Sequence, residues 1–272
     1  MLALIIFCFS SCSVFGDEPD NFDRGLRYLD EQDFPRAVEA LKRWTEDNPE
    51  DEIGWYNLGR AYLGTKQLEL ERKAYEKALS VNENDVRSMV NLAAVYDTMG
   101  DTRRARTLLE RASSEETSRA YPLYSLAHFH QRHGDARRAG ELYRTALERE
   151  PENALANYRY ASFLATQNKS SEALRYYDVT LKSWPGDLAT LFAAGELSHK
   201  LDRHRKAVGY FEQALLKAPD NVETRLSCAE CYVALKRYWP AAQHLKKAQA
   251  VDSKNQRVNT MLKSVVAKLA EE

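Results

Sequence analysis

The 272-residue sequence predicts an all-α protein built as a solenoid of repeated helix pairs. One pattern of small and large apolar residues recurs seven times at a spacing of 34 residues, with no insertion or deletion between residues 18 and 255. Inside each copy the apolar residues follow the period of an α-helix, and glycine or proline falls between the periodic segments. A fixed period in this size range indicates stacked units that each contact their neighbours.

Three columns align the copies. A small residue stands at Gly25, Gly59, Ala93, Ala127, Ala161, Gly195 and Ala229. Twelve residues later a second small column contains Ala37, Ala105, Ala139, Ala173, Ala207 and Ala241, with Glu71 as its exception. Four residues further on comes a large apolar column of Leu41, Tyr75, Leu109, Tyr143, Tyr177, Phe211 and Leu245. The small columns allow two helix backbones to approach closely, and the large column fills the space between them.

Each copy contains two helices joined by a turn. In the second copy Trp55, Leu58, Gly59 and Tyr62 are spaced i, i+3, i+4 and i+7, which places them on one helical face. A second apolar stripe follows after a turn. Glycine at residues 100 and 134, and asparagine at 168, mark such turns because these residues tolerate the left-handed conformation that ends a helix.

These joint spacings resemble the tetratricopeptide repeat family over residues 18–255. The resemblance implies a right-handed α-solenoid of seven helix-turn-helix repeats, at residues 18–51, 52–85, 86–119, 120–153, 154–187, 188–221 and 222–255. Departures are local and concern packing: Glu71 in the second small column, Thr180 in place of an alanine, and Asn21, Asn157 and Arg225 in the column of Trp55. The apolar stripe of residues 256–272 predicts a capping helix over the last open face.

The first 17 residues differ in kind from the repeats. Met1 to Phe9 is apolar, and no charged residue appears before Asp17, which is typical of a signal peptide or a lipoprotein leader. The run Phe9-Ser10-Ser11-Cys12 resembles a relaxed bacterial lipobox, in which Cys12 would be lipidated; alternatively, cleavage falls before Asp17. Both kinds of leader usually carry a basic residue soon after Met1, and this sequence has none. A third alternative is therefore that the segment is neither kind of leader. We expect an exported protein, either a membrane-anchored lipoprotein facing the periplasm or a secreted or periplasmic one.

The remaining candidate sites favour packing over chemistry. Cys228 and Cys231 form a Cys-x-x-Cys pair, but they occupy the inward face of the seventh repeat and are expected to pack as small hydrophobes. His128 and His130 point roughly 200° apart on a helix, so His133 cannot join both around one cation. The sequence therefore predicts no metal site and no cofactor.

Composition and motifs narrow the function classes. A formal net charge of −1 gives no reason to expect a nucleic-acid partner. Phosphate-binding loops, metalloprotease motifs and nucleophile elbows are absent from the sequence, so an enzyme with an unrecognised site is the weakest of the three hypotheses. The stronger hypotheses are a noncatalytic scaffold for an envelope complex and an accessory subunit that recruits substrate for an envelope enzyme or transporter.

The resemblance also implies where a partner would bind. In this family the first helix of each repeat lines a concave groove that holds peptides or helices of partner proteins. Carried onto this chain, the groove residues are Tyr56, Asn57, Arg60, Arg87, Asn91, Tyr124, His128, Tyr158, Arg159 and Phe192. Aromatic side chains beside amide and guanidinium donors suit an extended peptide. The alternative is that these residues only support neighbouring helices.

Overall fold

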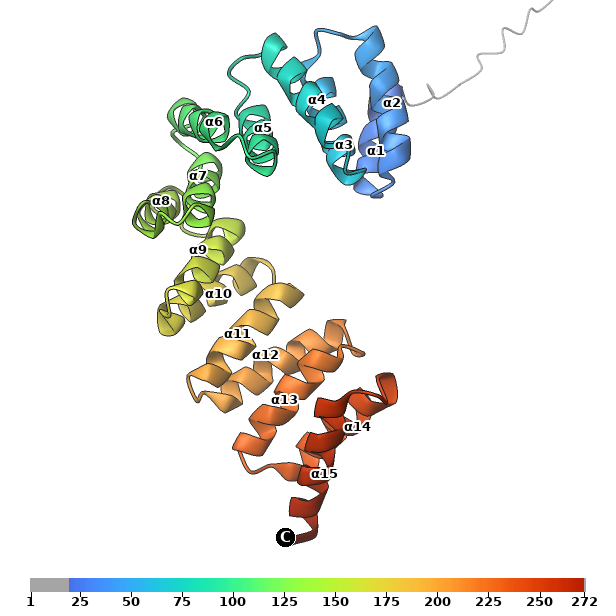
Figure 1. Cartoon of the computed structure of the whole chain (residues 1–272), viewed down its shortest axis with the longest axis vertical. Coiled ribbons are helices and arrows are strands. Elements are labelled where there is room, and N and C mark those ends of the chain that lie inside the picture. Colours follow the sequence, from blue (N-terminus) through green and yellow to red (C-terminus); the bar gives the residue numbers. More distant parts are fainter. Residues whose placement is uncertain (1–19, 272) are drawn as a thin grey trace, which may run out of the picture. The chain divides into compact units, whose positions relative to one another are not determined.

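The computed structural model describes residues 20–271 (Figure 1), and in that range the chain forms helices and no strand. The helices are α1 (Asn21–Asp30), α2 (Phe34–Asp47), α3 (Glu52–Gly64), α4 (Leu68–Val81), α5 (Val86–Thr98), α6 (Thr102–Glu115), α7 (Tyr121–Arg132), α8 (Ala136–Arg149), α9 (Ala154–Thr166), α10 (Ser170–Ser183), α11 (Leu188–Lys200), α12 (His204–Lys217), α13 (Val222–Ala234), α14 (Tyr238–Val251) and α15 (Gln256–Glu271). The all-α prediction is confirmed.

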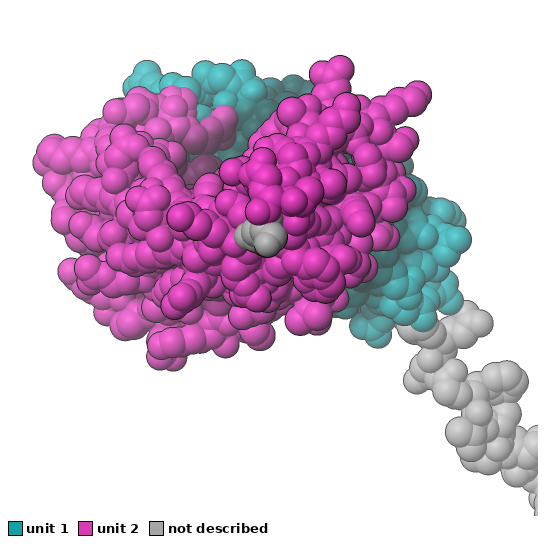
Figure 2. Space-filling view, turned by 90° about the horizontal axis from the view of Figure 1, so that it is seen from below, with its two compact units in different colours: residues 1–115 teal, residues 116–272 magenta. Residues whose placement is uncertain are grey.

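The chain divides into two compact units, which Figure 2 shows in different colours. Unit 1 ends at Glu115 and contains α1 to α6; unit 2 begins at Glu116 and contains α7 to α15. Within each unit the helices pair as hairpins, and the second helix of one hairpin packs against the first helix of the next. This is the arrangement of a helical repeat solenoid. In unit 2, α15 packs against α14 and buries Val258 and Val265 in the adjoining core.

The small and large columns of the sequence meet in the core of each hairpin. A Cβ atom added to Gly59 would lie 2.5 Å from Cε1 of Tyr75, and one added to Gly195 would lie 2.5 Å from Cε1 of Phe211. Both aromatic side chains are fully buried. Real Cβ contacts are not this short, so glycine is required at these two positions by the close approach of an aromatic ring.

The turn inside every hairpin repeats one backbone conformation. A residue with positive φ occurs in each of the seven turns of the described chain, at Gln32, Lys66, Gly100, Gly134, Asn168, Asp202 and Lys236. These residues are 34 apart, so the period of the sequence is also a period of the backbone. The predicted left-handed turns at residues 100, 134 and 168 are confirmed.

The start of α7 differs from the starts of the other first helices. Asp85, Asn153, Asp187 and Asn221 each accept a hydrogen bond from the backbone N–H three residues later, and Asp51 caps α3 in a related way. The equivalent residue before α7 is Arg119, and the N-cap of α7 is Ala120, whose side chain makes no cap bond.

The acceptor that the Arg119 side chain cannot provide comes from Glu150, the C-cap residue of α8. Oε1 of Glu150 accepts the Ala120 N–H at 3.1 Å. Nη1 of Arg149 donates to the carbonyl oxygens of Glu116 and Arg119, at 3.3 Å and 3.4 Å. The end of α8 thus holds the segment that precedes α7.

Candidate protein-binding surfaces

In unit 1 the predicted groove residues lie on α3 and α5. The guanidinium carbon of Arg87 lies 4.8 Å from the ring centroid of Tyr56, and Nε of Arg87 donates to Oδ1 of Asp85 at 3.1 Å. Tyr56 is half-buried and packs against Tyr75, with 6.0 Å between ring centroids. Two residues from neighbouring helices are therefore brought together as a cation–π pair.

Asn57 and Arg60 form a second contact in unit 1. Asn57 is only 4% exposed, its Nδ2 donates to the Ile53 carbonyl at 2.9 Å, and its Oδ1 accepts from Nη1 of Arg60 at 2.9 Å. Both polar atoms of the Asn57 amide thus bond to other groups of the protein, and the bond to Nη1 orients Arg60. Arg60 is exposed and presents the rest of its guanidinium outward.

Asn91 lies on α5 beside a pocket of about 350 Å³. The pocket is also lined by Leu63, Lys66, Leu68, Glu71, Ala94, Val95 and Thr98. We call the set Tyr56, Arg60, Arg87 and Asn91 the unit 1 surface.

In unit 2 the predicted residues lie on α7, α9 and α11. Tyr124 is 5% exposed, and the guanidinium carbon of Arg159 lies 5.5 Å from its ring centroid. Burial raises the pKa of the Tyr124 hydroxyl. Tyr124 therefore offers little surface and serves as a platform for Arg159, while His128 on α7 is half-buried.

Tyr158 and Phe192 occupy equivalent places on α9 and α11. Each is half-buried and rests on a buried ring of the large column: Tyr158 on Tyr177 at 5.9 Å and Phe192 on Phe211 at 5.8 Å between centroids. Phe192 also lines a pocket of about 200 Å³. We call His128, Tyr158, Arg159 and Phe192 the unit 2 surface. The role of both surfaces stays a prediction.

The two cysteines of α13 are fully buried free thiols, as the packing interpretation requires. Burial raises the pKa of both Cys228 and Cys231 to about 12, so neither is a reactive thiolate at neutral pH. Their neighbours were missed by sequence reasoning. Sγ of Cys231 lies 3.3 Å from Nδ1 of His199, and Sγ of Cys228 lies 3.7 Å from Nε2 of His244.

The described residues contain two groups whose ligand atoms lie close enough to hold a metal ion: His199, His204 and Cys231, and Glu212, Cys228 and His244. Neither includes the histidines of α7, where Nδ1 of His130 instead lies 3.5 Å from Asp135. The sequence does contain one indication of this contact. His199 and Cys231 are 32 residues apart, close to the repeat period, which places them on the first helices of neighbouring repeats.

The predicted leader at 1–17, with Cys12, lies outside the described residues. Among the helices of residues 20–271, none has both the length and the apolar character needed to span a bilayer.

Comparisons with known proteins agree on one family. A family model described as tetratricopeptide repeat matches residues 67–251, and a second model of the same description matches residues 22–85. A curated TPR repeat-containing protein of Pseudomonas aeruginosa is 39% identical over 59 residues, which are 22% of this chain and 56% of the relative. The chain thus spans about half the length of that relative.

Solved structures show the same fold at low identity. PilF of Pseudomonas aeruginosa aligns at a TM-score of 0.64 and 15% identity, over 78% of this chain and 97% of that one. PilW, a type IV pilus biogenesis factor, aligns at 0.63 and 16% identity, over 78% and 98%. A chain of the APC/C heterotetramer Cut9-Hcn1 aligns at 0.62 and 16% identity, over 89% of this chain and 51% of that one.

Proteins of this kind are generally noncatalytic scaffolds that bind protein or peptide partners. Because one family model covers more than half of the sequence and the helix pairs follow its period, this chain belongs to the tetratricopeptide repeat family.

Proposed function

We propose that the chain is a noncatalytic scaffold that binds a peptide or a helical segment of a partner protein on the first helices of its repeats. The observation that carries the proposal is the unit 2 surface, where Tyr158 and Phe192 follow one another on successive first helices with Arg159 beside them. Both rings keep part of their surface exposed and can cover apolar side chains of a partner.

The support behind these rings favours binding. Tyr177 and Phe211 are almost fully buried and fix the orientation of Tyr158 and Phe192 from below. A surface that is ordered before binding loses less conformational freedom when the partner arrives. The pocket of about 200 Å³ next to Phe192 offers a place for one partner side chain.

The polar groups suit the backbone of an extended segment. Arg159 is only partly buried, and its guanidinium carbon lies 5.5 Å from the ring centroid of Tyr124, so the ring orients the guanidinium. On the unit 1 surface, Arg60 is oriented by Asn57 in a comparable way. Oriented guanidinium groups can donate to the carbonyl oxygens of a bound segment.

The proposed setting is a bacterial envelope, where the scaffold would help to assemble a protein complex. What supports this setting is the apolar run before Asp17, with Cys12 as the candidate lipid-bearing residue. The formal net charge of −1 gives nucleic acid no evident attraction.

Photo-crosslinking from the unit 2 surface tests the binding proposal. A photoreactive amino acid in place of Tyr158 or Phe192 should capture a protein partner, and Trp239 on α14, which is 66% exposed, provides a matched aromatic control. With the captured partner in purified form, Tyr158→Ala combined with Phe192→Ala should raise Kd at least about tenfold, while Trp239→Ala leaves it unchanged. Equal capture from all three positions, or capture of no protein, would contradict the proposal.

The setting has a separate test. Metabolic labelling with a fatty-acid probe should mark the wild-type chain and leave Cys12→Ala unmarked, and cell fractionation should place the wild type with the envelope. Equal labelling of both chains would remove the lipid, and recovery from the cytoplasm would remove the envelope setting without affecting the binding test.

A further inference from the structure

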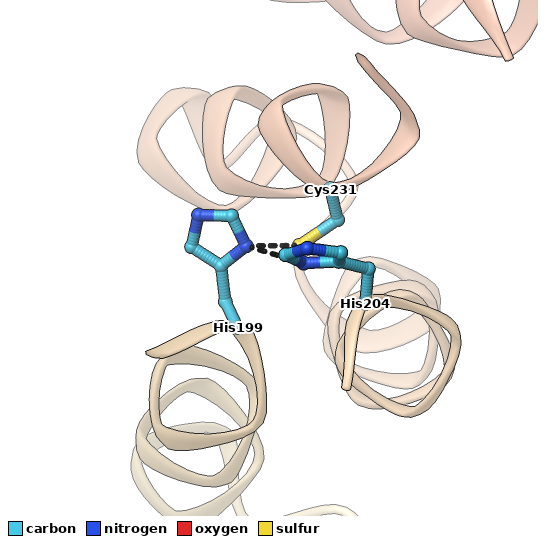
Figure 3. Close-up of side chains that lie close together, drawn as sticks. All are labelled: His199, His204 and Cys231. Carbon is cyan, nitrogen blue, oxygen red and sulfur yellow. Dashed lines mark hydrogen bonds between the residues drawn. The ribbon is translucent and has the colours of Figure 1, made fainter. Parts of the chain in front are cut away.

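Three side chains with metal-binding atoms meet where the sixth and seventh repeats pack together (Figure 3). His199 lies in the last turn of α11, His204 is the first residue of α12, and Cys231 comes from α13. Nδ1 of His199 is 3.1 Å from Nδ1 of His204 and 3.3 Å from Sγ of Cys231. All three ligand atoms lie within 4.8 Å of one another.

The two short distances are close to those around a bound zinc ion. With Zn–N bonds of about 2.0 Å, a Zn–S bond of about 2.3 Å and tetrahedral angles, two nitrogens lie about 3.3 Å apart and a nitrogen and a sulfur about 3.5 Å apart. The corresponding distances here are 3.1 Å and 3.3 Å. A small outward movement of the side chains would admit the ion.

The repeat does not need this set of residues for packing. The equivalent residues one repeat earlier are Ala165, Ser170 and Leu197. Two repeats earlier they are Gln131, Ala136 and Phe163. No other junction of the seven repeats combines three metal-binding residue types at these places. The set is therefore a local departure in which a buried thiol replaces the usual apolar side chain.

The fold fixes the ligands and leaves an approach for solvent. His199 and His204 flank the tight turn at Asp202, where φ is 56°, so their separation is set by the backbone. Both imidazoles are partly exposed, whereas Cys231 is fully buried. The other ring nitrogen of His204, Nε2, lies 3.7 Å from Oδ1 of the exposed Asp202 carboxylate.

We propose that His199, His204 and Cys231 bind a Zn²⁺ ion, with water as the fourth ligand. On binding, the Cys231 thiol loses its proton to solvent, and the thiolate and the two neutral imidazoles each donate an electron pair to the ion. The ion would tie the turn between α11 and α12 to α13, and so fasten the sixth repeat to the seventh.

The second group, of Glu212, Cys228 and His244, provides a matched control. Its thiol and imidazole are 3.7 Å apart, and Glu212 already accepts a hydrogen bond from the Tyr232 hydroxyl at 2.5 Å. Cys228 lies one helical turn before Cys231 on α13 and is equally buried. Removing either thiol therefore disturbs the core to a similar degree but affects different ligand sets.

Cobalt titration of the full chain tests the site. The protein is reduced, stripped with a chelator and titrated with Co²⁺ without oxygen, because a Co²⁺–thiolate bond gives a charge-transfer absorption. One equivalent should bind, Zn²⁺ should displace it, and Zn²⁺ should raise the Tm. Cys231→Ala should abolish the absorption and the Tm shift, while Cys228→Ala should keep both.

His204→Gln keeps the proposal testable if Cys231→Ala fails to fold, because the His204 side chain is partly exposed and its loss leaves the core intact. This variant should weaken metal binding at least about tenfold. Absence of binding to the wild type, loss of binding in Cys228→Ala with retention in Cys231→Ala, or unchanged binding in His204→Gln would each overturn the site.

Discussion

Units 1 and 2 use the same repeat register but fill one core position with different chemistry. In unit 2 the second small column is alanine in every repeat, at Ala139, Ala173, Ala207 and Ala241. In unit 1 the same column contains Glu71, which is 4% exposed. Burial raises the pKa of the Glu71 carboxyl to about 7, from an ordinary value of 4.5.

The repeat tolerates a glutamate at this core position because of the space beside it. Glu71 borders the pocket of about 350 Å³ in unit 1, so a longer side chain finds room that a closely packed alanine site lacks. The pocket does not hydrate the carboxyl as bulk water does, however, so the ionised form of Glu71 remains unfavourable there. Unit 1 therefore has a pH-dependent cost at a position where unit 2 has none.

The two largest effects are expected from removing that carboxyl and from placing one at the equivalent position of unit 2. A folded-state pKa of about 7 and an ordinary value of 4.5 mean that the unfolded chain releases the proton first, so stability falls as pH rises between these values. The full difference corresponds to about 3 kcal/mol. We expect Glu71→Ala to raise the free energy of unfolding by about 2–3 kcal/mol at pH 8 and to have little effect at pH 4, as measured by urea unfolding.

Ala139→Glu makes the reciprocal change in unit 2. Ala139 is fully buried, so the new side chain adds overpacking to the cost of the charge, and we expect a loss of at least about 3 kcal/mol at pH 8. An effect of Glu71→Ala that is equal at both pH values would show that packing, rather than ionisation, separates the units.

Periodicity made the fold predictable, because helix pairs, turns and columns all repeat with the sequence. The capping helix followed from one apolar stripe, and the burial of Cys228 and Cys231 followed from their place in the register. Glu71 is visible in the sequence as a departure from the small column, but its environment is set by pocket residues from neighbouring helices, which the repeat pattern does not specify.

The candidate sites were less predictable, because register gives the helix and the face of a residue but not its depth. Asn57 and Tyr124 stand in the predicted groove columns, yet both are buried and support Arg60 and Arg159. The group of His199, His204 and Cys231 comes from three different helices. Histidines that are close together in the sequence, such as those of α7, do not indicate it.

The N-caps give the next comparison between the units. Oδ2 of Asp85 in unit 1 accepts from both the backbone N–H and the hydroxyl of Ser88, at 3.1 Å and 2.6 Å. Asp85→Ala should therefore lower the free energy of unfolding by about 1–2 kcal/mol. Arg119→Ala, at the equivalent place in unit 2, should change it by less than about 0.5 kcal/mol, because Arg119 caps nothing. Equal losses in thermal or urea unfolding would contradict the comparison.

A smaller effect is expected at Glu150, which replaces the missing cap of α7. Its carboxylate accepts the Ala120 N–H at 3.1 Å and also a hydrogen bond from Nδ2 of Asn153. Glu150→Gln keeps an acceptor but loses the charge, so we expect a loss of about 0.5–1 kcal/mol, with faster hydrogen exchange of the first amides of α7. Glu152→Gln, a neighbouring exposed carboxylate, is the control and should leave both measurements unchanged.

The smallest effect is expected from restoring a side-chain cap to α7, which lacks the cap that its neighbours have. The residue three positions after Arg119 is Pro122, which has no N–H for a cap to accept. Arg119→Asn alone is left with the N–H two residues later as its donor, the one that Asp51 accepts at α3, and should change the free energy of unfolding by less than about 0.5 kcal/mol. In the background of Pro122→Ala the same substitution gains a donor to cap, and we expect it to stabilise unit 2 by about 0.5–1 kcal/mol. A double-mutant cycle in urea measures this coupling, and additive effects would mean that α7 begins one residue late for a reason other than its proline.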